Sequence, residues 1–115
     1  VAFNVELAPG TTIAEARAIA AVIREGGTDG LPGVRAIGLE LTRPDGLRLV
    51  QVSTNVEDHL ATSLARVVAA VSEHAEVTGA ELVGLAPRAA FDGFPDTVPV
   101  RHRRILEDAL DEVSS

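Results

Sequence analysis

The chain has 115 residues, of which 46% are hydrophobic, so it is long and apolar enough to bury the core of one domain. Its formal net charge of −7 argues against a nucleic-acid partner, because phosphate binding needs clustered basic side chains. No apolar run approaches the length of a membrane span, and the absence of cysteine excludes disulfides and fits a reducing compartment. We therefore expect one soluble domain over residues 1–115, located in the cytoplasm.

The amino-terminal part predicts a strand and then a helix. Residues 1–7 alternate apolar and other side chains, with the period of a strand that buries one face. Thr12 and Glu15 have the spacing of a capping box, in which the threonine side chain binds a free backbone N–H and the glutamate reaches back. The apolar stripe from Ile13 to Ile23 then predicts the helix itself.

A hairpin, a second helix and a fourth strand are predicted next. Residues 34–42 and 49–56 both alternate, and the string Arg43-Pro44-Asp45-Gly46 between them suits a tight turn. Apolar side chains at helical spacing over 64–75 predict the second helix, and the apolar run 80–86 predicts a short strand.

A last amphipathic helix is predicted over about residues 99–113. Its apolar face consists of Ile105, Leu106, Ala109, Leu110 and Val113. The basic run Arg101–Arg104 would open this helix and acidic residues would close it, which opposes the helix dipole. Two explanations stay open: compensation by the i,i+4 pairs Arg103–Glu107 and Arg104–Asp108, or an anion or acidic subunit held by the arginines.

The element order β-α-β-β-α-β followed by a helix predicts an α/β (α+β) fold of the ferredoxin-like plait type. In that fold the two crossover helices cover one face of a four-stranded antiparallel sheet. The core would lie within residues 1–91, with residues 1–7 and 49–56 as the two central strands. The C-terminal helix would be an addition to the plait.

Polar side chains are expected on the central strands of the face turned away from the helices. They are Asn4, Glu6, Gln51, Ser53 and Asn55. Two interpretations stay open, because a two-layer plait leaves this face to water, whereas amides and carboxylates there can also bind a ligand or a second layer. RNA-binding plaits stack bases on aromatic residues at these positions, so an RNA-recognition motif is excluded.

Other candidate residues are few. His59, His74 and His102 have no metal-pair spacing, so no metal site is expected. Asp58 follows the third strand, where it either faces a ligand or caps the coming helix. The glycine-rich loop 26–33 lacks the G-K-[ST] ending of a phosphate-binding loop.

Four strings in collinear order resemble the C-terminal subdomain of the formiminotransferase family. They are VAFNVEL at 1–7, VRAIGL at 34–39, QVSTN at 51–55 followed by Asp58, and ELVGLAP at 81–87. The third is similar to a Q-V-S-x-N signature of the family. His59 stands where an aromatic residue is usual, and residues 91–98 depart from the family's alanine-rich continuation.

The resemblance implies part of a glutamate formimidoyltransferase, which moves a formimino group from N-formiminoglutamate to tetrahydrofolate in histidine degradation. Folate would lie in a cleft between two subdomains, and no metal is implied. The catalytic histidine belongs to the N-terminal subdomain, so no catalytic residue is assigned to this chain. The folate-facing or substrate-facing candidates are Asn4, Gln51, Ser53, Asn55 and Asp58.

Two functional hypotheses follow. Because Val1 already lies in a predicted strand, we expect a catalytic N-terminal subdomain upstream or on a partner chain. We also expect a homodimer. This chain alone would then be inactive. The alternative is a free-standing, non-enzymatic binding or oligomerisation module that kept the fold and lost the activity.

Overall fold

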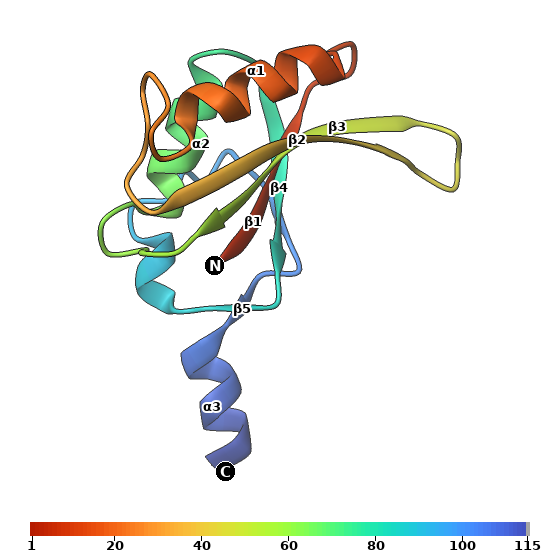
Figure 1. Cartoon of the computed structure of the whole chain (residues 1–115). Helices are drawn as coiled ribbons and strands as arrows, with labels where there is room; N and C mark the ends of the chain where they lie inside the picture. The colour runs from red at the N-terminus through yellow and green to blue at the C-terminus, as the bar shows by residue number, and fades with distance from the viewer. Residues whose placement is uncertain (115) are drawn as a thin grey trace.

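The computed structural model describes residues 1–114, with side chains as far as Glu112 (Figure 1). The main elements are β1 (Ala2–Leu7), α1 (Ile13–Ile23), β2 (Val34–Thr42), β3 (Arg48–Val56), α2 (Leu64–Ser72) and β4 (Val77–Val83). After these come β5 (Leu85–Ala86), a 3₁₀ helix η1 (Arg88–Phe91), β6 (Val100–Arg101), β7 (Arg104–Ile105) and α3 (Leu106–Ser114). No helix among the described residues is long and apolar enough to cross a membrane.

The sheet has the strand order β2-β3-β1-β4-β6, and α1 and α2 cover one of its faces (Figure 1). As predicted, β1 and β3 lie at the centre and pair antiparallel, and β2 and β3 form a hairpin. The turn at 43–46 closes as expected, with the Gly46 N–H donating to the Arg43 carbonyl at 2.9 Å and a positive φ at Gly46. The predicted mixed α/β fold is therefore confirmed.

Both main helices begin at side-chain caps. The Thr12 hydroxyl accepts the Glu15 N–H at 3.1 Å, and the Ser63 hydroxyl accepts the Arg66 N–H at 3.2 Å. The Glu15 carboxylate accepts a hydrogen bond from the Thr12 hydroxyl at 3.2 Å. The second bond of the capping box therefore joins the two side chains. These caps fix where the helices start over the sheet.

The core lies between the helices and the sheet. Its largest fully buried side chains include Phe3, Ile23, Leu64, Leu82, Val52 and Val71. Two buried hydroxyl groups are satisfied by backbone carbonyls: Thr54 donates to Phe3 at 2.6 Å and Thr62 to Pro32 at 2.7 Å. These bonds tie β3 to β1 and the loop before α2 to the loop before β2.

The close approach of α1 to β2 depends on Gly38. A Cβ atom at this position would lie 2.6 Å from the Arg17 backbone nitrogen. The helix therefore rests on the small-residue face of β2, which also carries Ala36, and Ile37 points to the opposite side of the sheet.

The C-terminal part differs from the prediction. The sheet has a fifth strand, because β6 pairs in parallel with the outer edge of β4 through Ala80↔Val100 and Glu81↔Arg101. The last helix begins at Leu106 and not near residue 99, because residues 99–101 satisfy the backbone groups of an exposed strand edge. Val113 lies in α3, but its side chain is outside the described part.

The predicted charge pairs of the last helix are wrong for the same reason. Glu107 and Asp108 lie in the first turn of α3, where negative charge suits the helix dipole. Both bind Arg88: its backbone N–H donates to the Glu107 carboxylate at 3.0 Å, and its guanidinium pairs with Asp108. The run Arg101–Arg104 lies outside the helix.

The three phenylalanines of the chain meet at one end of the core. Phe3 of β1, Phe91 of η1 and Phe94 form edge-to-face contacts with centroid distances of 5.5 to 6.3 Å. The guanidinium of Arg103 lies 4.1 Å from the centre of the Phe91 ring. The segment after β4 thus seals the core before it returns to the edge of the sheet.

Candidate functional site

The face of the sheet opposite the helices has an apolar half and a polar half. On the edge strand β2, Ile37 and Leu41 are 59% and 46% exposed, with Leu39 between them. We call Ile37, Leu39 and Leu41 the apolar strip. On β1, β3 and β4 the register places polar residues on the same face: Asn4, Glu6, Gln51, Ser53, Asn55 and Glu81. We call these the polar row.

Within the polar row, exposure falls from one end of β3 to the other. Asn55 is exposed, Ser53 is half-buried, and Gln51 is only 2% exposed. Asn4 lies between Ser53 and Glu81 in the register and is half-buried. The structure therefore brings four of the five predicted site residues onto one continuous surface.

The burial of Gln51 corrects the expectation of a uniformly exposed row. Its cross-strand neighbours are Leu39 of the apolar strip and Glu6 of β1. No side-chain hydrogen bond of Gln51 occurs within residues 1–114, and no fully buried side-chain polar atom there lacks a partner. The tip of the amide must therefore reach the surface.

Asp58 does not join the other candidates. Its carboxylate accepts hydrogen bonds from the backbone N–H groups of Leu60 at 3.1 Å and Ala61 at 3.2 Å, which closes the turn after β3. The cap of α2 is Ser63 and not Asp58. The contacts of Asp58 are those of a turn residue.

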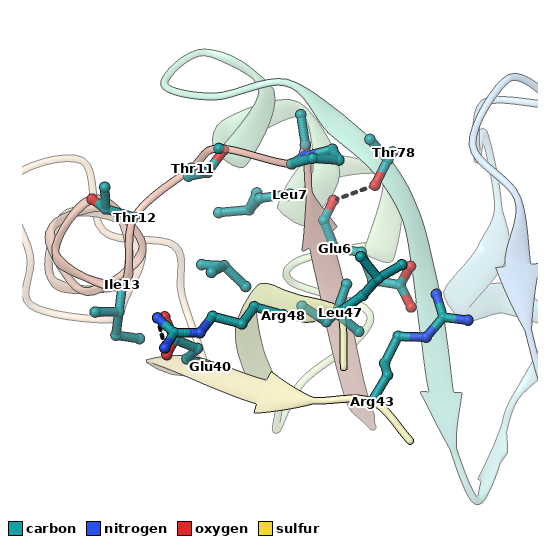
Figure 2. A pocket seen from close by; sticks show the side chains of 15 residues that line it. Glu6, Leu7, Thr11, Thr12, Ile13, Glu40, Arg43, Leu47, Arg48 and Thr78 are labelled. Atoms are coloured by element: carbon teal, nitrogen blue, oxygen red, sulfur yellow. Dashed lines mark hydrogen bonds and ion pairs between the residues drawn. The ribbon is translucent and has the colours of Figure 1, made fainter. Parts of the chain in front are cut away.

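A groove of about 700 Å³ opens beside the polar row, at the end of the sheet where the β2–β3 hairpin leaves the body (Figure 2). The β1–α1 loop forms one wall and the base of the hairpin forms the other. Arg43 and Arg48 lie on the hairpin side, where they pair with Asp45 at 3.4 Å and Glu40 at 3.6 Å. Glu6 and Thr78 lie where the groove meets the sheet, so the groove and the polar row share a carboxylate.

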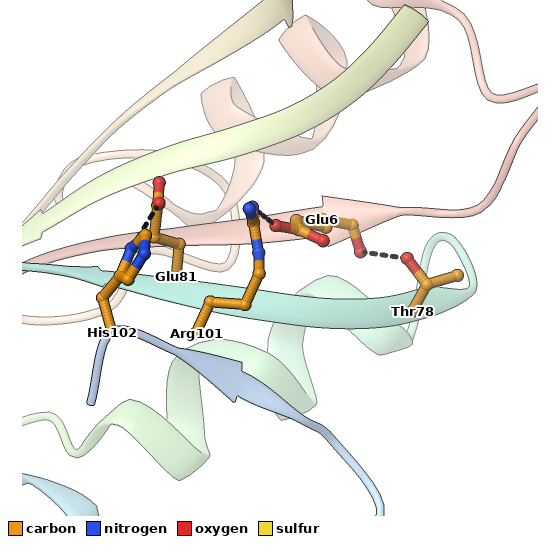
Figure 3. A network of polar contacts seen from close by, with 5 residues as sticks. All are labelled: Glu6, Thr78, Glu81, Arg101 and His102. Atoms are coloured by element: carbon orange, nitrogen blue, oxygen red, sulfur yellow. Dashed lines mark hydrogen bonds and ion pairs between the residues drawn. The ribbon is translucent and has the colours of Figure 1, made fainter. Parts of the chain in front are cut away.

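Two consecutive residues after the fourth strand hold the carboxylates of the polar row (Figure 3). Arg101 of β6 pairs with Glu6, and the Nδ1 atom of His102 lies 3.0 Å from Glu81. His102 has a φ of +59°, which reorients the chain so that both neighbouring side chains reach the same face. We call Pro99–His102 the strap.

The strap could not be found from periodicity. The stretch 99–104 has the composition of a charged helix start, and two-residue strands give no alternating pattern. The one available signal was the unfavourable order of basic and acidic residues in a helix over 99–113.

The three histidines lie in different segments of the chain. His59 follows β3, His74 follows α2, and His102 belongs to the strap. Within the described residues no group of three or more acidic or histidine side chains is arranged to hold a metal ion.

Comparison with known protein families gives a match to the formiminotransferase domain over residues 2–94. The chain belongs to the formiminotransferase-domain family. This confirms the resemblance seen in the four strings, all of which lie within or at the border of the matched region. A search among curated proteins finds no match.

Family membership also separates the candidate surface into two parts. The apolar strip, the polar row and the groove all lie within the formiminotransferase match, whereas the strap at 99–102 lies outside it. The family implies folate use, and the strap is an addition to the region that matches the family.

Proposed function

We propose that this chain is a folate-cleft-forming subdomain of a glutamate formimidoyltransferase-like enzyme. The reaction is formimino transfer from N-formiminoglutamate to tetrahydrofolate, a step of histidine degradation in the cytoplasm, and the catalytic histidine comes from an N-terminal subdomain or partner chain. The observation that supports this proposal is the family match over residues 2–94, which contains the whole polar row.

The polar row is suited to one wall of such a cleft. It offers amide, hydroxyl and carboxylate groups side by side on rigid central strands, which suits recognition of the polar groups of both substrates. The neighbouring groove supplies two arginines, and guanidinium groups bind carboxylates such as the glutamate tails of both substrates. The chain thereby contributes binding and orientation, and the chemistry comes from its neighbour.

The experiment compares tetrahydrofolate binding by this chain alone and by the same chain joined to a formiminotransferase N-terminal subdomain. Calorimetry is the suitable readout, since the chain contains no tryptophan or tyrosine to report by fluorescence. We expect binding only in the joined protein, followed by formimino transfer when N-formiminoglutamate is added. Absence of folate binding in both proteins contradicts the proposal.

The apolar strip supports a second candidate, a binding or oligomerisation module that pairs with another sheet. Ile37 and Leu41 are exposed on the edge strand β2 beside the polar row, and covering them would remove apolar surface from water. The partner sheet belongs to a second copy of the chain, which gives a homodimer, or to the N-terminal subdomain. Loss of transfer with retained self-association would favour this module over the enzyme.

A further inference from the structure

The face of the sheet opposite the helices is called the open face below. The carboxylate of Glu6 is the most enclosed charged group on it. Its side chain is 14% exposed, and its ion pair with Arg101 joins two residues that lie 95 positions apart in the chain. Gly79 of the neighbouring strand lies against it, since a Cβ atom there would be at an ordinary contact distance of 3.4 Å from Glu6 Oε2. The carboxylate therefore lies between β1 and β4, and we call the cation-binding position at this carboxylate the seat.

A second acceptor lies directly beside this seat. Gln51 is the cross-strand partner of Glu6 and is only 2% exposed. It makes no side-chain hydrogen bond within residues 1–114. A carboxylate and an amide oxygen on paired positions of neighbouring strands together offer several acceptor sites in a small area. This set suits a planar cation with several N–H donors.

Arg101 is such a cation, and it shows what the seat accepts. A guanidinium group presents N–H donors on a planar carbon centre, and a carboxylate binds this geometry through parallel hydrogen bonds. An amidinium has the same N–C–N plane, and the protonated formimino group of N-formiminoglutamate is an amidinium. The chemistry that holds Arg101 would therefore hold the formimino group.

We propose that Glu6, with Gln51 beside it, forms a binding site for an amidinium group, and that Arg101 occupies this site as an intramolecular stand-in. This inference rests on the proposed function, because it assigns the formimino donor to a seat on the polar row. The strap then acts as a competitor that must leave before the donor binds.

The strap is built to be displaced. It pairs with β4 over only two residues, its Arg101 side chain is 52% exposed, and His102 adopts a left-handed backbone conformation that side chains disfavour. It also lies outside the formiminotransferase match at 2–94. Since donor and strap exclude each other, removing Arg101 should raise the apparent affinity for amidinium ligands.

The test uses formamidine hydrochloride as the probe and the complete 115-residue chain, with binding followed by backbone amide shifts in NMR spectra. In Arg101→Ala we expect formamidine to bind roughly tenfold more tightly than in the wild type, with the largest shifts around Glu6, Gln51 and Gly79. Adding Glu6→Gln to Arg101→Ala should remove this binding.

Two controls isolate the seat. Arg35→Ala removes an exposed arginine that pairs with Glu57 at 2.6 Å on the same sheet, and it should leave formamidine binding at the wild-type level. Tetramethylammonium has the same charge without N–H donors and should cause no shifts around Glu6. If Arg101→Ala does not fold, Arg101→Gln keeps a polar side chain without the guanidinium charge and is expected to behave in the same way.

Equal formamidine binding by the wild type and Arg101→Ala overturns the proposal, as does binding that survives Glu6→Gln. Failure here is distinct from failure of the proposed function, because formamidine binding needs neither folate nor an N-terminal subdomain. Formamidine binding without folate binding in the joined protein would keep the amidinium seat and refute the formiminotransferase role.

Discussion

Asn55 and Gln51 lie on the same face of β3, yet their surroundings differ. Asn55 is exposed near the start of β1, where its Oδ1 atom accepts a hydrogen bond from the Val1 amino group at 3.4 Å. Gln51 lies between Leu39 and Glu6 and is almost fully buried. Strand alternation places both residues on the open face, but it does not determine how much of each one its neighbours cover.

Substitution of Asn55 by alanine separates binding from stability. We expect Asn55→Ala to weaken folate or subdomain binding about fivefold, whereas the free energy of unfolding should change by less than about 0.5 kcal/mol, since the side chain is exposed. Calorimetry of the joined protein and thermal unfolding of this chain measure the two effects.

A matched control is Thr28→Ala, in the exposed loop before β2 and away from the open face. It should change neither quantity. A large loss of stability in Asn55→Ala with unchanged binding would show that the residue has a structural role only.

At the scale of elements, the contact between α1 and β2 determines which face of the hairpin is buried. The sequence pattern of β2 separates Ile37, Leu39 and Leu41 from Ala36 and Gly38, but hydrophobicity alone does not reveal that the smaller side faces the helix. The close backbone approach at Gly38 determines that the smaller side of β2 faces α1, because any larger side chain there would push the helix away.

Gly38→Ala should therefore destabilise the fold by about 2 kcal/mol, since the added methyl group overlaps the backbone of Arg17. Chemical denaturation monitored by circular dichroism measures the change. Gly10→Ala is the control, because Gly10 has open space around its Cα atom and only its φ of +95° opposes a side chain. Its cost should stay near 1 kcal/mol, and a smaller loss at Gly38 than at Gly10 would contradict the packing argument.

Most elements could be predicted because each contains its own local signal. The cap at Thr12, the alternation of 34–42 and the turn glycine at Gly46 all depend on residues a few positions apart. The candidate seat could not be predicted in this way, since Glu6 meets Arg101 only through the tertiary fold. The same limit applies to β6, whose two residues form a strand only because the edge of β4 is available.

At the scale of the whole molecule, the two halves of the open face differ in chemical character. The polar row offers hydrogen-bonding groups, and the apolar strip offers area that water does not favour. A partner sheet that covers the strip would close one side of the polar row without touching its centre. Assembly and ligand binding would then share one face of the protein.

A charge in the apolar strip should interrupt assembly without unfolding the chain. We expect Ile37→Glu, at a residue that is 59% exposed, to reduce self-association or docking of the N-terminal subdomain at least about tenfold. Analytical ultracentrifugation measures this change. Leu60→Glu, at a loop residue 81% exposed, is the control and should leave assembly intact. Equal loss in both variants would remove the strip from consideration as an interface.

The pairing of Glu6 with Arg101 also has a consequence for the order of events during synthesis. These residues are 95 positions apart, so translation at about 5 to 20 residues per second leaves a delay of about 5 to 20 seconds between them. Throughout that time Glu6 has been made and its partner has not. A nascent chain with β1, β3 and β4 already folded would thus present an empty carboxylate, and the mature protein would present an occupied one.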